Sequence, residues 1–146
     1  MAHAGYPATW DRGHQGRVVS DAVNFNVPHP EVHANQNFDQ TTDGPAGARG
    51  ELSVGGQTAA LLPAPVLQAA TWSKSSIREL GRILSSEALS KSADVLLAPT
   101  ICCMRNPLGG RNFESFSEDP VLSGKLAVEY VAGVQESGEV VATAKH

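Results

Sequence analysis

Two stretches with helical periodicity, each followed by a short and almost wholly apolar stretch, restrict the folds open to this chain of 146 residues. In the first, apolar residues recur at steps of three, four or seven after a cap at Ser73 or Ser75. The second begins at Pro120, with Asp119 as its cap, and is closed by Gly138. The two apolar faces consist of Ile77, Leu80, Ile83, Leu84 and Ala88, and of Leu122, Leu126, Ala127, Tyr130, Val131 and Val134.

The apolar stretches that follow these helices, residues 93–98 and 140–144, are predicted to be strands. Strands that alternate with helices of about 15 residues run parallel, so the pattern predicts an α/β fold. Functional side chains in such folds lie at the carboxyl ends of the strands. This rule points to the long connection over residues 99–119 and to Lys145-His146 after the last strand.

The chain before the first helix divides into two parts. Residues 1–40 carry four of the five histidines and little periodicity, and we expect an irregular polar leader. From residue 41 onward we expect one domain portion that extends to residue 146. It opens with a tight loop at Asp43-Gly44-Pro45 and Gly47 to Gly50. Residues 59–62 and 64–70 form an apolar stretch that predicts a buried strand.

Charge and composition exclude several function classes. The formal charge is −4, and the clustered Lys and Arg that nucleic acids require are missing. No apolar run is long enough to span a membrane, and no signal peptide is visible, which favours an intracellular chain. The adjacent Cys102 and Cys103 are expected to be reduced thiols. His29 and His33 lack further ligands at suitable spacing, so we expect neither a metal nor another cofactor.

The densest polar group lies in the long connection, at residues 109–120. Arg111 follows two glycines and presents a planar fork of donors suited to sugar hydroxyls or carboxylates. Its acidic neighbours Glu114, Glu118 and Asp119 include a possible acid/base pair. We favour a structural role for them, in which Glu114 pairs with an arginine and Asp119 caps the next helix. Lys145-His146 adds donors for a ligand at the carboxyl end of the last strand, and Asp43, in the glycine-rich loop, is an exposed carboxylate that can accept hydrogen bonds from hydroxyl groups.

These residues stand in motifs that resemble glycoside hydrolase family 3, in particular its β-glucosidases of fungal type. The most specific motif is Arg105-Asn106-Pro107-Leu108-Gly109-Gly110-Arg111-Asn112-Phe113-Glu114-Ser115-Phe116-Ser117-Glu118-Asp119-Pro120. The loop beginning Thr42-Asp43-Gly44-Pro45, the run Ala69-Ala70-Thr71-Trp72, residues 93–100 and the run Ala142-Thr143-Ala144-Lys145-His146 complete the likeness. It covers residues 41–146, in order and at suitable spacing.

The resemblance implies a (β/α)8 TIM-type barrel, of which 146 residues supply only the N-terminal part, so a truncated fragment is expected. It implies that Asp43, Arg111, Lys145 and His146 hold the hydroxyls of a terminal glucose. The partner would be a small β-glucoside or oligosaccharide, and the sequence indicates no oligomeric state.

The family resemblance also implies a retaining mechanism that uses two carboxyl groups. The family nucleophile is an Asp in a Ser-Asp-Trp-like context, but neither Trp10 nor Trp72 follows an Asp. We therefore expect the nucleophile and the acid/base beyond the chain end, and this chain alone to be inactive. The alternative is a non-catalytic carbohydrate-binding module or an inactive remnant of the family.

Overall fold

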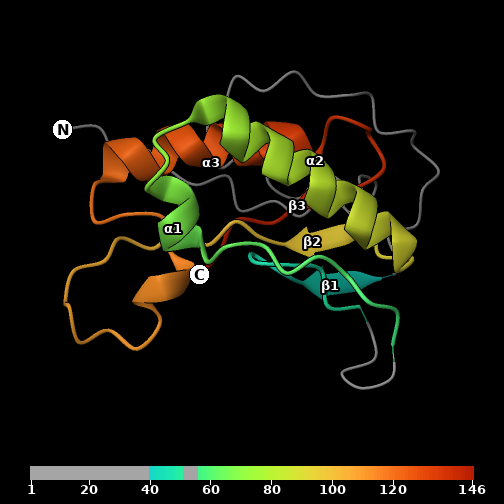
Figure 1. The fold of residues 1–146 in the computed structure, drawn as a ribbon, viewed down its shortest axis with the longest axis horizontal. Coiled ribbons are helices and arrows are strands. Elements are labelled where there is room, and N and C mark those ends of the chain that lie inside the picture. Colours follow the sequence, from blue (N-terminus) through green and yellow to red (C-terminus); the bar gives the residue numbers. More distant parts are fainter. Residues whose placement is uncertain (1–39, 51–55) are drawn as a thin grey trace, which may run out of the picture.

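The computed structural model describes residues 40–50 and 56–146. Its elements in chain order are β1 (Thr41–Asp43), α1 (Pro65–Ala69), α2 (Lys74–Ser90), β2 (Val95–Leu97), the 3-10 helix η1 (Asn112–Glu114), α3 (Pro120–Val134) and β3 (Val141–Ala142) (Figure 1). The expected leader and its His29–His33 cluster lie outside the described residues, apart from Gln40. Among the helices that are described, none is long and apolar enough to cross a membrane.

The three strands form one parallel sheet in the order β1-β2-β3. Leu96 at its centre pairs with Thr42 on one side and with Ala142 on the other. This arrangement confirms the predicted parallel pairing of β2 and β3 and the α/β class. β1 was not expected: Asp43 was assigned to the tight loop, and the two residues before it were given no strand. A strand this short shows no period of its own and is recognised only through its partner.

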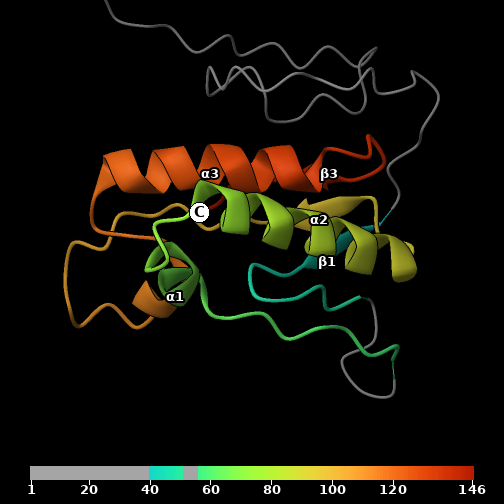
Figure 2. The same cartoon turned by 45° about the horizontal axis from the view of Figure 1, so that its top comes forward.

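Helices α2 and α3 lie side by side over one face of the sheet (Figure 2). The apolar core is formed by residues of both helices and of the sheet. Most of the predicted apolar faces are buried, among them Ile77, Leu84, Leu126 and Tyr130, with at most 1% of each residue exposed. Ile83 is an exception at 37% exposure. The predicted helix faces thus form the core of the domain.

Close approach of the two helices depends on Gly81 and Gly133. A Cβ atom on Gly81 would lie 2.5 Å from the carbonyl oxygen of Tyr130, and one on Gly133 would overlap the carbonyl oxygen of Arg78. Both glycines therefore allow backbone-to-backbone contact that any larger residue would prevent. Gly124, also in α3, faces open space.

The predicted helix starts are confirmed. The hydroxyl of Ser73 accepts a hydrogen bond from the amide of Ser76, and the carboxylate of Asp119 accepts one from the amide of Val121. Pro120 occupies the first turn of α3, where its missing N–H costs nothing. The connection over residues 99–119 is irregular apart from η1, as expected.

The strand predicted over residues 59–70 is wrong. Residues 59–62 have no regular structure and are mostly exposed, and Pro65–Ala69 form the short helix α1. Pro65 begins this helix, where it cannot donate to a strand ladder but fits a first turn. Gln68 is 1% exposed, and its side-chain amide donates to the carbonyl oxygens of Pro45 and Pro63. These bonds tie α1 to the loop after β1.

Candidate functional site

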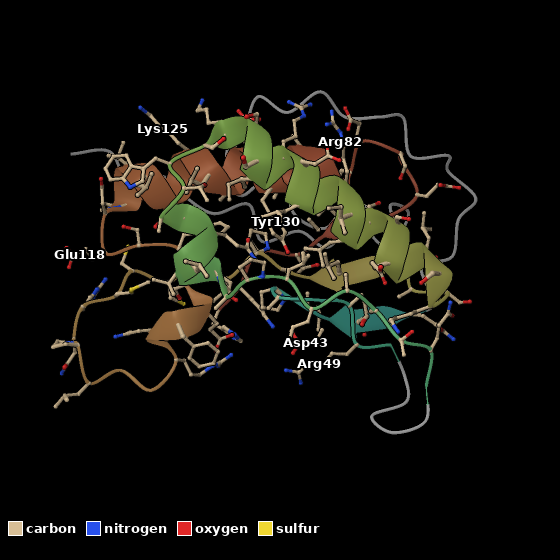
Figure 3. All side chains as sticks on the ribbon, viewed as in Figure 1. Asp43, Arg49, Arg82, Glu118, Lys125 and Tyr130 are labelled. Atoms are coloured by element: carbon tan, nitrogen blue, oxygen red, sulfur yellow. The ribbon has the colours of Figure 1, made fainter. Side chains whose placement is uncertain are left out.

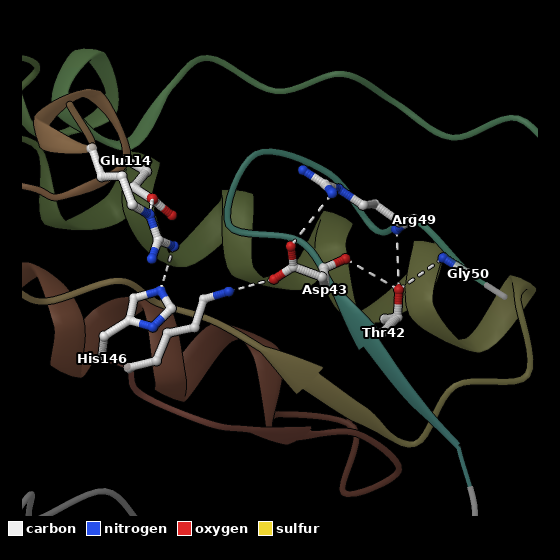
Figure 4. A network of polar contacts seen from close by, with 8 residues as sticks. Thr42, Asp43, Arg49, Gly50, Glu114 and His146 are labelled. Atoms are coloured by element: carbon white, nitrogen blue, oxygen red, sulfur yellow. Dashed lines mark hydrogen bonds and ion pairs between the residues drawn. The ribbon is translucent and has the colours of Figure 1, made fainter. Parts of the chain in front are cut away.

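The residues singled out in the sequence lie at one edge of the sheet. Asp43 is the last residue of β1, and Lys145 and His146 lie three and four residues beyond the end of β3. Lys145 also forms a parallel bridge with Thr100, just beyond β2, which aligns the segments after the two strands. Arg111 lies in the connection that follows β2, directly before η1. The parallel strands bring Asp43, Lys145 and His146 to this edge, and Arg111 reaches it from the connection. Asp43 and His146 are labelled in Figure 4, where dashed lines mark their contacts.

Asp43 and Lys145 form the first of two contacts that join distant segments. Nζ of Lys145 donates a hydrogen bond to Oδ1 of Asp43, and the Lys145 side chain is only 16% exposed. Burial alone would raise the pKa of Asp43. The hydrogen bond from Lys145, with the charges of Lys145 and Arg49, outweighs burial and lowers that pKa below its ordinary value. Asp43 is therefore a carboxylate at neutral pH.

Arg111 and His146 form the second contact. Nη2 of Arg111 lies 2.6 Å from Nε2 of His146. A guanidinium can only donate, so Nε2 of the imidazole accepts in this contact. The proton of the neutral ring is then on Nδ1, where it is available to another acceptor.

Arg111 is itself held by Glu114, which is 9% exposed. Nε of Arg111 donates to Oε1 of Glu114. This hydrogen bond lowers the pKa of Glu114, although burial opposes the shift, and the same bond raises the pKa of Arg111. The structural roles favoured for the acids are thereby confirmed: Glu114 pairs with an arginine, and Asp119 caps α3.

Two residues at this edge were not singled out in the sequence. Nη1 of Arg49 lies 3.7 Å from Oδ2 of Asp43, so Asp43 has a cation on either side. The hydroxyl of Thr42 accepts hydrogen bonds from the backbone amides of Arg49 and Gly50. The sequence feature that could have indicated a role for Arg49 is its positive charge within the glycine-rich loop. For Thr42, the sequence gives only its position directly before Asp43.

The cysteines border the same site. Both are free and exposed, and Sγ of Cys102 accepts a hydrogen bond from the amide of His146 at 3.5 Å. In the part of the chain that the structure describes, no three His, Cys, Asp or Glu side chains are arranged to hold a metal ion. The polar groups described at this edge are two paired carboxylates, an ammonium, two guanidinium groups and an imidazole.

Residues 45–146 match the Glycosyl hydrolase family 3 N terminal domain. β-Glucosidase B of Emericella nidulans is 58% identical over 107 residues, which cover 73% of this chain and 12% of that protein. β-Glucosidase 3B from Thermotoga neapolitana, solved in complex with α-D-glucose, superposes with a TM-score of 0.66 at 42% identity. β-Glucosidase from Kluyveromyces marxianus, in complex with glucose, gives a TM-score of 0.70 at 40% identity.

Each of these two structures matches 73% of this chain, which covers 15% of the Thermotoga chain and 13% of the Kluyveromyces chain. This chain thus spans a small share of the length of the relatives it matches. The match over residues 45–146 includes the whole connection between β2 and α3, with Arg111, and the Lys145-His146 pair. It confirms the resemblance in those motifs, and the chain belongs to glycosyl hydrolase family 3.

Proposed function

We propose that this chain supplies the glucose-binding residues of a β-glucosidase that, at full length, hydrolyses terminal non-reducing β-D-glucosyl residues. The observation that carries the proposal is the convergence of Asp43, Arg111, Lys145 and His146 at one strand edge, in two contacting pairs. Relatives with glucose bound support a sugar as the ligand. The partner would be a small β-glucoside or an oligosaccharide.

The chemistry of the four groups suits a neutral polyol. Asp43 accepts hydrogen bonds, while Lys145, Arg111 and Nδ1 of His146 donate them, so each sugar hydroxyl can be matched by both kinds of partner. Hydrogen bonds that involve a charged group are about twice as strong as neutral ones. Each of the two carboxylates, Asp43 and Glu114, already contacts a cation, so neither needs a charged ligand as a partner.

We place the reacting carboxyl groups in parts of the full-length protein outside these 146 residues. A retaining glycosidase uses two carboxyl groups about 5–5.5 Å apart, one of which must be protonated to act as the acid. The pKa values of both Asp43 and Glu114 are lowered, which keeps these carboxyl groups ionised. Neither of the two tryptophans follows an Asp, as the family nucleophile motif requires.

In this proposal residues 41–146 form the N-terminal portion of a (β/α)8 barrel, and residues 1–40 precede it as a polar leader. Three parallel strands in sequential order, with a helix between β2 and β3 that packs on the sheet, are compatible with successive units of such a barrel. A whole barrel takes about 250 residues.

Calorimetric titration of the purified 146-residue chain with glucose tests the proposal. We expect binding by the wild type, much weaker binding by Asp43→Asn, and wild-type binding by Glu118→Gln, which neutralises an exposed carboxylate far from Asp43 (Figure 3). No measurable binding by a chain that circular dichroism shows to be folded would contradict the proposed subsite.

An aryl β-glucoside assay separates the catalytic part of the proposal from the binding part. We expect no hydrolysis by the 146-residue chain. Hydrolysis by this chain would overturn the placement of the reacting groups outside it. If a longer chain that includes the later barrel strands also binds glucose without hydrolysing the aryl glucoside, the protein is a carbohydrate-binding member of the family.

A further inference from the structure

Thr42 lies on β1 directly before Asp43 and is 2% exposed. Its Oγ1 accepts hydrogen bonds from the amides of Arg49 at 3.0 Å and Gly50 at 2.8 Å, and it donates one to the carbonyl oxygen of Asp43 at 3.1 Å. A hydroxyl has one proton to donate and two lone pairs to accept with, so its capacity is used in full. These bonds are visible in Figure 4.

The three bonds close the loop over residues 43–50 onto its own strand. Arg49 and Gly50 are seven and eight residues from Thr42 in the sequence, and a single side-chain oxygen fixes both of their amides. The amide of Arg49 also donates to the carbonyl oxygen of Asp43 at 3.1 Å. Both ends of the loop therefore meet at Thr42, and each end carries a charged side chain of the site.

From this geometry we propose that Thr42 is a positioning residue of the sugar site: its hydroxyl sets the separation of the Asp43 carboxylate and the Arg49 guanidinium. The two charged groups lie 3.7 Å apart. The Arg49 side chain is 77% exposed, and its contact with Asp43 is too long for a hydrogen bond. The backbone anchor at Thr42 is what places this cation beside the carboxylate. This inference rests on the proposed function, in which Asp43 binds the sugar.

A purely structural role would make Thr42 a core residue that valine could replace. Valine has nearly the same shape and would fill the same space, but it cannot accept from two amides. Serine keeps the hydroxyl and loses a methyl group. The pair Thr42→Val and Thr42→Ser therefore separates the hydrogen bonds from the packing.

The first measurement needs no sugar. Amide hydrogen exchange should show Gly50 protected in the wild type and in Thr42→Ser, with protection reduced at least about tenfold in Thr42→Val. Equal protection of Gly50 in all three chains would overturn the inference, whether or not glucose binds.

The second measurement is glucose affinity by calorimetry. We expect Thr42→Val to bind about tenfold more weakly and Thr42→Ser to bind like the wild type. The matched control is Thr71→Val, which removes a hydroxyl that accepts from Ser73 and donates to Gln68, at the junction of α1 and α2. It should cost stability without changing affinity. Unchanged affinity in Thr42→Val, or a loss in Thr42→Ser as large as in Thr42→Val, would overturn the positioning role. Absence of binding by the folded wild type would instead contradict the proposed function.

Discussion

Lys145 donates a hydrogen bond from Nζ to Oδ1 of Asp43, and so joins the carboxyl ends of the two outer strands across β2. The two residues are 102 positions apart in the sequence. Their pairing holds an acceptor and a donor side by side at the carboxyl ends of the strands. The Lys145 side chain is 16% exposed and that of Asp43 is 36% exposed, so part of each is accessible from outside the fold.

Replacement of Lys145 by methionine should raise the pKa of Asp43. The hydrogen bond and charge of Lys145 are the strongest influences that lower this pKa, and burial, which raises it, would remain. Carboxyl carbon shifts of Asp43 followed through an NMR titration give the measurement. The matched control is Lys125→Met, which removes an exposed lysine from α3 (Figure 3). An Asp43 titration that is the same in wild type and Lys145→Met would contradict the pairing.

The free energy of unfolding should fall as the solution is acidified. The pKa values of Asp43 and Glu114 are lowered in the folded chain, so their ionised forms stabilise the fold above the ordinary values of 3.8 and 4.5. That contribution is lost as the pH falls through the lower folded-state values. Urea unfolding between about pH 6 and about pH 3 measures the dependence.

Glu114→Gln should make this acid dependence shallower, because it removes one of the carboxylates whose pKa is lower in the folded chain. Arg111→Met should act in the same direction, since it removes the donor that lowers the pKa of Glu114. Lys125→Met changes the charge elsewhere by the same amount as Arg111→Met and should keep the wild-type slope. If Glu114→Gln keeps that slope as well, the Arg111–Glu114 pair does not stabilise the fold.

The helices α2 and α3 could be predicted because their signals are local. Each helix is preceded by a capping residue, Ser73 or Asp119, and contains apolar residues at steps of three and four. Most of these apolar residues belong to the hydrophobic core. The helix α1 could not be recognised in this way. Its five residues are held by the contacts of Gln68 with Pro45 and Pro63, and a run this short shows no period.

The carboxyl-end rule pointed to the connection over residues 99–119 and to Lys145-His146, because it depends only on the parallel order of the predicted strands. It did not reach Asp43, since β1 was not predicted. Which side chains pair could not be derived from that rule. Arg111 and His146 are 35 residues apart in the sequence, so their contact depends on the path of the connection after β2. Thr42 accepts a hydrogen bond from the backbone amide of Arg49, a group that nearly every residue carries and that no sequence pattern marks. The family motifs indicated which residues to examine, and only the tertiary structure showed which side chains contact one another.

Gly133→Ala should lower the free energy of unfolding by about 1–3 kcal/mol, the usual cost of forcing extra volume into a packed interface. Its Cβ would overlap the carbonyl oxygen of Arg78, which belongs to the backbone of α2 and cannot swing aside. The control is Gly124→Ala in the same helix, where nothing lies within 4 Å of the new Cβ. There, alanine should raise the free energy of unfolding by about 0.5–1 kcal/mol, since it favours helix. Equal effects of the two substitutions, measured by urea unfolding, would contradict the close helix contact.

Tyr130→Phe should leave the free energy of unfolding unchanged or raise it by up to about 1 kcal/mol. The Tyr130 side chain is fully buried, and within the described residues its hydroxyl has no hydrogen-bond partner. Burial also raises the pKa of this phenol, so the group stays neutral. Loss of an unpaired buried hydroxyl removes a desolvation cost and no hydrogen bond.

Tyr130→Leu supplies the contrast, because it keeps an apolar side chain but removes the ring. The ring of Tyr130 packs edge-on against Phe116, with centroids 6.0 Å apart and planes at 64°. Its loss should cost about 2–4 kcal/mol, part from the aromatic pair and part from the unfilled volume. A large destabilisation by Tyr130→Phe in the same urea series would show that the hydroxyl has a partner when the chain is in water.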